Sequence, residues 1–155
     1  MDGGNNELTG TIPTQFGNLP ELIILDLDSN QLTGTIPEEI FETATGLQQL
    51  DLDNNQLTGT ISTLLGTLTS LNFLQLHVNE LTGTFPNEEL LNLPLLTVIS
   101  LSDLELTGTV SSELCERRDT VGGIITNLWA DCATSAAIPV AQVPCPAGCC
   151  NTCEF

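Results

Sequence analysis

The sequence contains no lysine, and its two adjacent arginines, Arg117 and Arg118, stand against 20 aspartate and glutamate residues. The formal net charge at pH 7 is −18. A surface this acidic repels the phosphate groups of nucleic acids and of anionic membranes. We therefore expect no nucleic-acid partner, and an extracellular or marine setting in which salt screens the self-repulsion.

Residues that carry common catalytic chemistry are scarce. His77 is the only histidine, so a serine–histidine–aspartate triad would have to use it. Lysine for Schiff-base chemistry, a Gly-x-Ser-x-Gly turn and a glycine-rich phosphate loop are all missing. The acids Asp51 and Asp53 could flank a glycosidic bond, but acids at such positions are more often simply solvated. We predict that the protein is not an enzyme and needs neither a cofactor nor a resident metal.

Long apolar segments are absent as well. No stretch of about 18 residues is apolar throughout, so we expect no membrane span. Residues 1–4 lead directly into a half-complete repeat, with no signal peptide. We expect a mature or trimmed chain that is secreted or belongs to an ectodomain, with its export signal and any further repeats upstream.

Cysteine is absent from the first 114 residues and then occurs six times, at Cys115, Cys132, Cys145, Cys149, Cys150 and Cys153. An even number of cysteines in one segment predicts a disulfide framework and an oxidising compartment. Their pairing stays open, because six cysteines allow many connectivities. A zinc site is the weaker reading, since only one Cys-x-x-Cys pair is present.

The sequence repeats itself with a short period. The string LTGT starts at Leu8, Leu32, Leu57, Leu81 and Leu106, at spacings of 24, 25, 24 and 25 residues. Such a period predicts a solenoid, because one repeat cannot bury its apolar face alone. Aromatic residues make up only 4% and tyrosine is absent, so the core must be mainly leucine and isoleucine.

A second signature precedes LTGT in the later repeats. Residues 47–57 read LQQLDLDNNQL, and the same L-x-x-L-x-L-x-x-N-x-L pattern returns in residues 22–32 and 71–81. The L-x-L alternation predicts a strand with one buried face. The asparagines follow the strand, where their amides can satisfy buried backbone groups of the turn. We expect a ladder of Asn6, Asn30, Asn55 and Asn79 that ends at Leu104.

The combined pattern L-x-x-L-x-L-x-x-N-x-L-T-G-x-I-P resembles the plant-type leucine-rich repeat over about residues 5–112. The resemblance implies an α/β solenoid, a right-handed superhelix with a concave parallel β-sheet, a second face of short strands and convex 3₁₀ or helical turns. It also implies about five repeats within residues 1–112, the first incomplete. Proline follows the isoleucine position at Pro13, Pro37 and Pro86, and serine replaces it at Ser62 and Ser111.

Residues 113–155 resemble the cysteine-rich C-terminal caps of secreted algal and diatom proteins of this family. The matching segments are residues 128–132, LWADC, and residues 149–153, CCNTC. We expect one last strand over residues 125–130, followed by a disulfide-rich cap that covers the end of the leucine stack.

The concave face is the usual binding surface of this family, and strand alternation predicts which side chains it presents. They are Ile24, Asp26, Asp28, Gln49, Asp51, Asp53, Phe73, Gln75, His77, Val98, Ser100, Ser102 and Trp129. An apolar column beside an acidic patch suits a protein or peptide ligand with basic groups, and the family resemblance also admits a glycan. The alternatives are that these side chains are merely solvated, or that Asp26, Asp28, Asp51 and Asp53 hold a calcium ion.

The T-G-T segments define a second surface. The threonines are Thr9, Thr11, Thr33, Thr35, Thr58, Thr60, Thr82, Thr84, Thr107 and Thr109. If these segments are strands in line, the threonines form two ranks about 6.6 Å apart, with about 4.8 Å between coils. Such a grid resembles the T-x-T arrays of ice-binding solenoids, so binding of ice or of a crystal surface is our alternative function. The exposed first coil also predicts end-to-end self-association.

Overall fold

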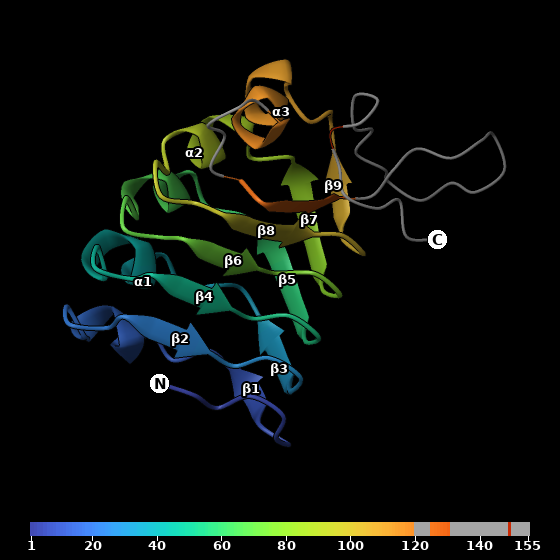
Figure 1. Cartoon of the computed structure of the whole chain (residues 1–155). Helices are drawn as coiled ribbons and strands as arrows, with labels where there is room; N and C mark the ends of the chain where they lie inside the picture. The colour runs from blue at the N-terminus through green and yellow to red at the C-terminus, as the bar shows by residue number, and fades with distance from the viewer. Residues whose placement is uncertain (120–124, 131–148, 150–155) are drawn as a thin grey trace, which may run out of the picture.

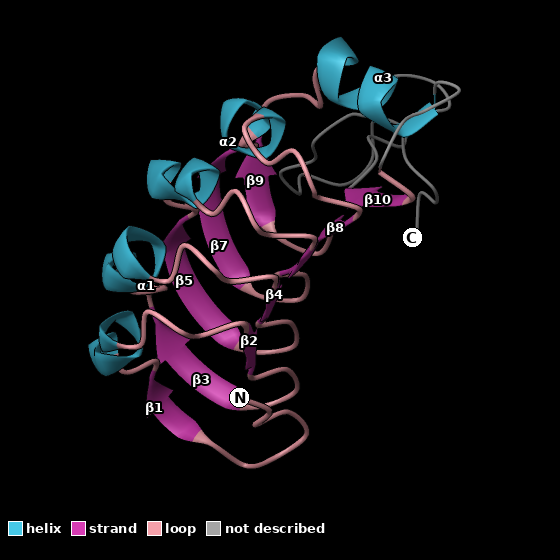
Figure 2. Cartoon of the chain, turned by 60° about the vertical axis from the view of Figure 1, so that its left-hand side comes forward, coloured by secondary structure: helices cyan, strands magenta, loops and turns pink. Residues whose placement is uncertain are grey.

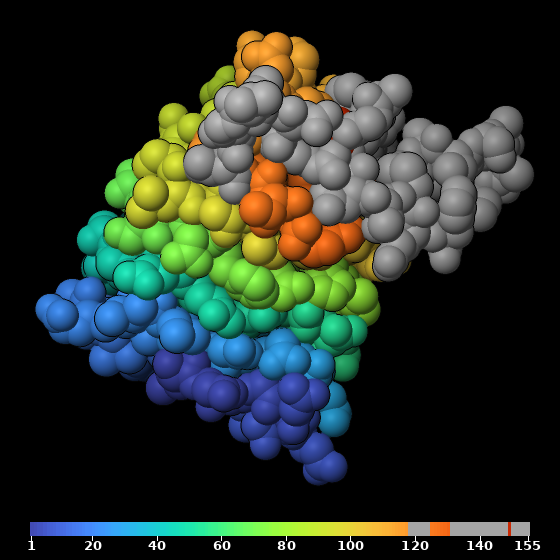
Figure 3. All heavy atoms as spheres, viewed as in Figure 1, coloured from blue at the N-terminus to red at the C-terminus, as the bar shows by residue number. Residues whose placement is uncertain are grey.

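The computed structural model describes residues 1–119, 125–130 and 149. The chain forms a curved stack of coils that begins at the N-terminus and ends under the helix α3 (Figure 1). Each complete coil contributes one strand from its L-x-L segment, one strand from its LTGT segment and one helical turn. Figure 3 shows the coils as successive bands across the molecule. The predicted leucine-rich-repeat solenoid is confirmed.

The concave sheet is built from the L-x-L segments and has the strand order β10-β8-β6-β4-β2, all parallel. Its strands are β2 (Ile24–Asp26), β4 (Gln49–Asp51), β6 (Phe73–Gln75), β8 (Val98–Leu101) and β10 (Asn127–Ala130). Equivalent residues lie side by side, so Leu25, Leu50, Leu74, Ile99 and Leu128 form one row, and all five are fully buried. The predicted last strand is present and begins at Asn127.

The second sheet is built from the LTGT segments and has the order β1-β3-β5-β7-β9, also parallel. Its strands are β1 (Thr9–Thr11), β3 (Gln31–Gly34), β5 (Gln56–Thr60), β7 (Glu80–Thr84) and β9 (Glu105–Thr107). Here equivalent residues are not in line. Gly10 pairs with Leu32 and Gly59 with Leu81, so each strand is displaced by two residues from the one before it.

Short helical turns form the convex side (Figure 2). They are η1 (Thr14–Asn18), α1 (Glu38–Thr43), η2 (Thr63–Thr67), α2 (Asn87–Leu91) and α3 (Ser112–Asp119). Pro13 and Pro37 precede their turns with extended backbones that fix the entry direction. Ser62 replaces proline before η2 and instead accepts a hydrogen bond from the backbone N–H of Leu64 at 3.2 Å. The exchange of proline for serine therefore preserves the start of the turn.

The predicted asparagine ladder joins successive coils. The Oδ1 atom of Asn55 accepts from the Leu32 N–H of the preceding coil at 3.0 Å, and its Nδ2 donates to the Leu27 and Leu52 carbonyls. Asn30 and Asn79 repeat this arrangement one coil away. Leu104 occupies the next position and is 3% exposed, so the last full coil replaces the amide by an apolar contact.

The N-terminal edge differs in part from the expected bare coil. An opening strand is missing, but residues 1–3 pair with the edge of β2, since the Asp26 N–H donates to the Met1 carbonyl and the Gly3 N–H to the Asp26 carbonyl. Toward the core the edge stays open, with Leu8 43% and Leu19 41% exposed. A cavity of about 340 Å³ lies there, lined by residues that include Leu8 and Phe16. Self-association through this edge remains a prediction.

A disulfide and an arginine of α3 help to hold the described part of the C-terminal end. A disulfide joins Cys115 to Cys149 across a Cα–Cα distance of 5.2 Å. The Arg117 guanidinium donates to the carbonyls of Leu90, Leu91 and Leu93 at the end of α2, and burial lowers its pKa. The remaining predicted cap cysteines, Cys132, Cys145, Cys150 and Cys153, lie outside the described residues. In the part of the chain that is described, no helix is long and apolar enough to cross a bilayer.

Candidate functional site

The predicted concave residues come together in columns that run across the sheet. The first column is Ile24, Gln49, Phe73, Val98 and Asn127. The second column is Asp26, Asp51, Gln75, Ser100 and Trp129. The third column is Asp28, Asp53, His77 and Ser102, whose order follows from backbone hydrogen bonds between successive turns. Asn127 is a member of the first column that was not predicted, because the sequence alone does not determine the register of the last strand.

Backbone alternation explains why these side chains face away from the core. Leu50 and Leu52 are fully buried on the inner face of the sheet, so the intervening Asp51 lies on the concave side. The same alternation holds for Asp26 between Leu25 and Leu27, which are 0% and 5% exposed. The first two columns are therefore surfaces of the sheet, which gives them a fixed spacing, and the third column continues them into the turns that follow the strands.

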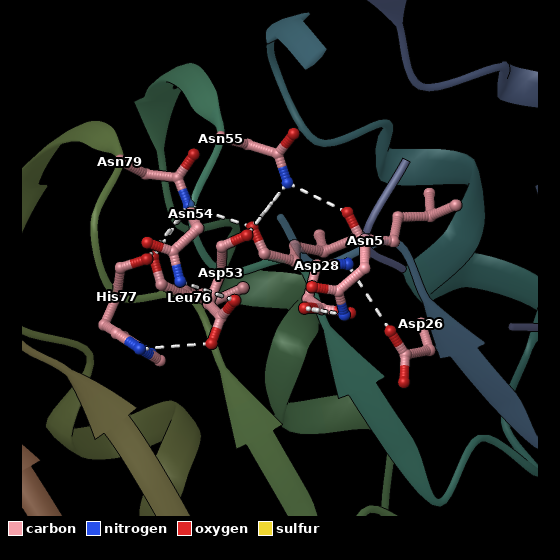
Figure 4. Close-up of polar contacts among 11 residues, drawn as sticks. Asn5, Asp26, Asp28, Asp53, Asn54, Asn55, Leu76, His77 and Asn79 are labelled. Carbon is pink, nitrogen blue, oxygen red and sulfur yellow. Dashed lines mark hydrogen bonds and ion pairs between the residues drawn. The ribbon is translucent and has the colours of Figure 1, made fainter. Parts of the chain in front are cut away.

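The third column contains a close contact between a histidine and an aspartate of neighbouring coils (Figure 4). His77 Nε2 lies 3.1 Å from Asp53 Oδ2, and the Asn54 amide donates to Asp53 Oδ1 at 3.1 Å. The Nδ1 atom of His77 is buried and has no partner among the described residues. The local sequence around His77 does not indicate a partner for it. Its true partner is 24 residues earlier, one repeat away, and the period itself could have found it.

The second column contains a buried carboxylate. Asp51 is 8% exposed, and its Oδ1 atom has no hydrogen-bond partner in the described structure. Burial raises the pKa of Asp51 to about 7, and the negative charges of Asp53 and Asp26 act in the same direction. Burial also raises the pKa of Asp26, with further contributions from Asp28. Near neutral pH, Asp51 is therefore divided between its charged and neutral forms.

The four aspartates do not converge on a common point. Asp28 Oδ2 accepts from the Asn5 amide at 3.2 Å, and Asp26 Oδ2 accepts from the Gln49 amide at 3.4 Å (Figure 4 labels Asn5, Asp26 and Asp28). Within residues 1–119, 125–130 and 149, no group of three or more histidine, cysteine, aspartate or glutamate side chains is arranged to hold a metal ion. Of the three interpretations of these aspartates, which are ligand binding, simple solvation and a calcium site, the geometry therefore supports the calcium site least.

The threonine face has a different geometry from the one expected. The two-residue displacement per strand places Thr11 beside Thr33 and Thr60 beside Thr82. A displacement of about 6.6 Å along the strand and a strand separation of about 4.8 Å together place equivalent threonines of successive coils about 8 Å apart. The predicted spacing of about 4.8 Å between equivalent threonines of successive coils is wrong, because that prediction assumed that the strands of this sheet are in line.

The threonines of this face also take part in coil stacking. The hydroxyls of Thr33, Thr82 and Thr107 donate to glycine carbonyls of the preceding coil at 3.0–3.2 Å. In three coils the second threonine of a segment packs its methyl group on the next coil's glycine: a Cβ added to Gly59 would lie 2.8 Å from Thr35 Cγ2, and Thr11 and Thr60 lie in the same way against Gly34 and Gly83. At these positions the threonine has a structural role that requires no ligand.

Comparison with known proteins identifies the family. The sequence profile of the leucine-rich-repeat family matches residues 4–57. A chain of the BIR3–SERK2 complex from Arabidopsis thaliana is 32% identical, with a TM-score of 0.71, and the match covers 92% of this chain and 71% of that one. The chain belongs to the leucine-rich-repeat family.

Two further solved structures resemble this leucine-rich-repeat protein. The plant peptide hormone receptor RGFR1, in complex with RGF2, is 40% identical with a TM-score of 0.76, over 83% of this chain and 20% of the receptor. A plant ice-binding protein is 32% identical with a TM-score of 0.71, over 82% of this chain and 39% of that protein. The leucine-rich-repeat chain thus spans about a fifth of the receptor's length. None of the curated proteins matches it by sequence.

Proposed function

We propose that this chain is a non-enzymatic recognition module that binds a protein or peptide ligand with basic groups on its concave face. The observation that carries the proposal is the register of the concave sheet, which brings separate repeats together into continuous columns. Phe73 gives the first column an apolar centre, while Asp26 and Asp51 place carboxylates beside it in the second. Apolar contact combined with complementary charge is what specific protein interfaces use.

The comparisons support recognition as the general role. RGFR1 was solved with RGF2 bound, and BIR3 was solved in complex with SERK2. No enzyme family is indicated by the matches. We also propose an extracellular location, since the Cys115–Cys149 disulfide requires an oxidising compartment to form and persist.

Selection from a displayed library of random peptides tests this proposal. We expect enrichment of peptides that contain arginine or lysine next to apolar residues. Binding of the enriched peptides should fall at least tenfold in Phe73→Ala and in Asp28→Lys. The matched control is Glu39→Lys, which makes the same charge change on an exposed residue of α1 and should alter binding less than twofold.

Equal binding by all of these variants would move the site away from the concave face. A glycan array run in parallel tests the ligand class. Glycan binding that is lost in Phe73→Ala, with no enriched peptide, would replace the peptide ligand by a glycan on the same surface.

A second candidate function is binding to ice or a crystal surface through the threonine face. It is favoured by the similarity to a plant ice-binding protein and by the exposure of Thr11, Thr35, Thr60 and Thr84. Thermal hysteresis and inhibition of ice recrystallisation measure it directly. If this function operates, Thr60→Lys should abolish both activities and Asp28→Lys should leave them intact. Inactivity of the wild type would remove this candidate.

A further inference from the structure

Asp51 is the feature of the concave face that the proposed function does not yet explain. Its Oδ1 atom and the Nδ1 atom of His77 are the two buried side-chain polar atoms without a hydrogen-bond partner in the described structure. An unpaired acceptor of this kind costs free energy, and native proteins tolerate few of them. Asp51 therefore lacks a donor that the described part of the chain does not supply.

The surroundings of Asp51 are acidic on nearly every side. Asp26 and Asp28 face it from the β2 side, and Asp53 is on its own strand segment. From the β6 side come Gln75, which pairs with it in register, and His77. Of these groups only His77 can carry positive charge, and it is already paired with Asp53.

The two arginines belong to a different part of the stack. Both are part of α3, which packs against α2 at the far end of the stack (Figure 1). The Arg117 guanidinium is directed at the carbonyls that follow Leu90 in that region. The sequence has no lysine, and the N-terminal ammonium group donates to the Ile24 carbonyl at 2.6 Å. A ligand is therefore the expected source of a cation at Asp51.

We propose that Asp51 is a subsite for a guanidinium group of the ligand, with Asp26 on the adjacent strand as the second acceptor. This inference rests on the proposed function, because it assigns one contact within the concave recognition surface. A guanidinium is more weakly hydrated than an ammonium group, so it enters a site that is 8% exposed at lower cost. Its planar fork can also reach two carboxylates on strands about 4.8 Å apart.

The structure favours an organic cation over a metal ion at this point. Asp26 and Asp28 already accept hydrogen bonds from amides, and the described residues contain no group arranged as metal ligands. A single unpaired acceptor requires a directional N–H donor. Gln75 is half-buried and pairs in register with Asp51. Because Asp51 Oδ1 is buried, our proposal requires the Gln75 side chain to change rotamer so that the guanidinium can enter.

Protonation of Asp51 has to oppose this binding. The pKa of Asp51 is about 7 in the free protein, so the carboxylate is mostly charged at pH 8 and mostly neutral at pH 6. A cation binds only the charged form. Affinity at this subsite should therefore be roughly tenfold weaker at pH 6 than at pH 8. The Asp51→Asn variant, measured at the same two pH values, shows how much of this difference belongs to Asp51.

The test uses Nα-acetyl-arginine amide as the probe and Nα-acetyl-citrulline amide as its neutral isostere. The ¹³Cγ signal of Asp51 is followed by NMR during titration at pH 8 and pH 6. We expect saturable binding of the arginine probe at millimolar concentration, at least tenfold weaker binding of the citrulline probe, and a lower Asp51 titration midpoint when the arginine probe is bound.

Three variants complete the experiment. Asp51→Asn should remove the preference for arginine over citrulline. Glu42→Gln removes one negative charge from an exposed position of α1 and should leave the preference unchanged. Gln75→Ala should tighten binding of the arginine probe, because it opens the entry path.

Equal weakening by Asp51→Asn and Glu42→Gln would overturn the subsite and leave only general charge attraction. A larger response of the Asp51 signal to calcium than to the arginine probe would overturn it in favour of a metal ion. The proposed function is tested separately. If selected peptides still bind Asp51→Asn but not Phe73→Ala, the concave surface stands and the guanidinium subsite is wrong.

Discussion

The two parallel sheets come from the same coils and yet differ in register. Strands of the concave sheet are in line, so Leu25, Leu50 and Leu74 are direct neighbours. Strands of the second sheet are displaced by two residues per coil. Equivalent residues of successive coils are therefore one strand separation apart in the concave sheet and farther apart in the second sheet.

This difference decides what each face can do. On the concave face, equivalent positions of successive repeats become adjacent, so one ligand can contact side chains such as Asp26, Asp51 and Phe73 from three coils. On the second face, threonine hydroxyls and methyl groups meet the glycines of the neighbouring coils. The concave face therefore presents groups to a ligand, whereas much of the threonine face is used in holding the coils together.

The largest effect is expected where the asparagine ladder joins the concave strands to the second sheet. Asn55→Ala removes one acceptor and several donated hydrogen bonds between buried groups. We expect a loss of about 3–4 kcal/mol in the free energy of unfolding, since each buried group left unpaired costs about 1–3 kcal/mol. Urea denaturation measures it, with the exposed Gln56→Ala as control. A loss below about 1 kcal/mol would contradict the ladder's role.

Substitution of a glycine in the second sheet should destabilise the protein. Gly59 has a φ angle of 86° and lies against the Thr35 methyl group. Gly59→Ala should cost about 2–3 kcal/mol, because a left-handed backbone costs a non-glycine residue about 1–2 kcal/mol and the new methyl group collides with its neighbour. Thr35→Ser removes the collision, so the double variant should lose less than the sum of the single losses. Strict additivity would show that the methyl contact is unimportant.

The acidic column should make stability depend on pH. The pKa of Asp51 is raised from 3.8 to about 7 in the folded protein, so the folded state binds this proton more tightly than the unfolded state. The contribution of Asp51 to the free energy of unfolding is fully present below about pH 4 and is lost as the pH rises through about 7. We expect Asp51→Asn to be more stable than the wild type at pH 8, by on the order of 2 kcal/mol, and the difference to shrink toward pH 4.

Glu42→Gln is the control for this pH dependence, because it removes the same charge from an exposed site. Thermal unfolding midpoints at several pH values give the comparison. An Asp51→Asn variant that follows the pH profile of the wild type would show that Asp51 is not the responsible group.

A smaller effect is expected at the turn that follows each concave strand. Ser29, Asn54, Val78 and Asp103 all have left-handed backbones, with φ between 49° and 53°. Valine is a poor residue there because its side chain branches at Cβ. Val78→Asn should raise stability by about 1 kcal/mol, seen as a higher melting temperature. Val98→Ala serves as a comparison on a regular strand. An unchanged or lower melting temperature in Val78→Asn would contradict this account.

Much of the fold follows from periodicity in the sequence. The spacing of LTGT and the L-x-L alternation predict the stack, the buried leucines and the asparagine ladder with its end at Leu104. The columns of the concave face follow in the same way, because in-line strands carry the period of the sequence directly into space. Local patterns suffice wherever equivalent residues become neighbours.

The features that the sequence did not predict depend on how whole coils pack. The displacement of the second sheet is a relation between neighbouring coils, which no single repeat encodes. To predict that residues 1–3 pair with β2, one would need to know which edge of the concave sheet is left open. The low exposure of Asp51 and its unpaired Oδ1 atom arise from surrounding coils and not from its own repeat, since Asp26 has the same repeat position and is only half-buried.

Chemical-shift mapping on the isotope-labelled chain tests the central claim most directly. An arginine-containing peptide from the selection is added, and backbone amide signals are followed for both sheets. We predict shift changes concentrated in residues 49–53 and 73–77, with residues 56–60 and 80–84 nearly unaffected. Changes confined to residues 56–60 and 80–84 would place the ligand on the threonine face and contradict recognition by the concave columns.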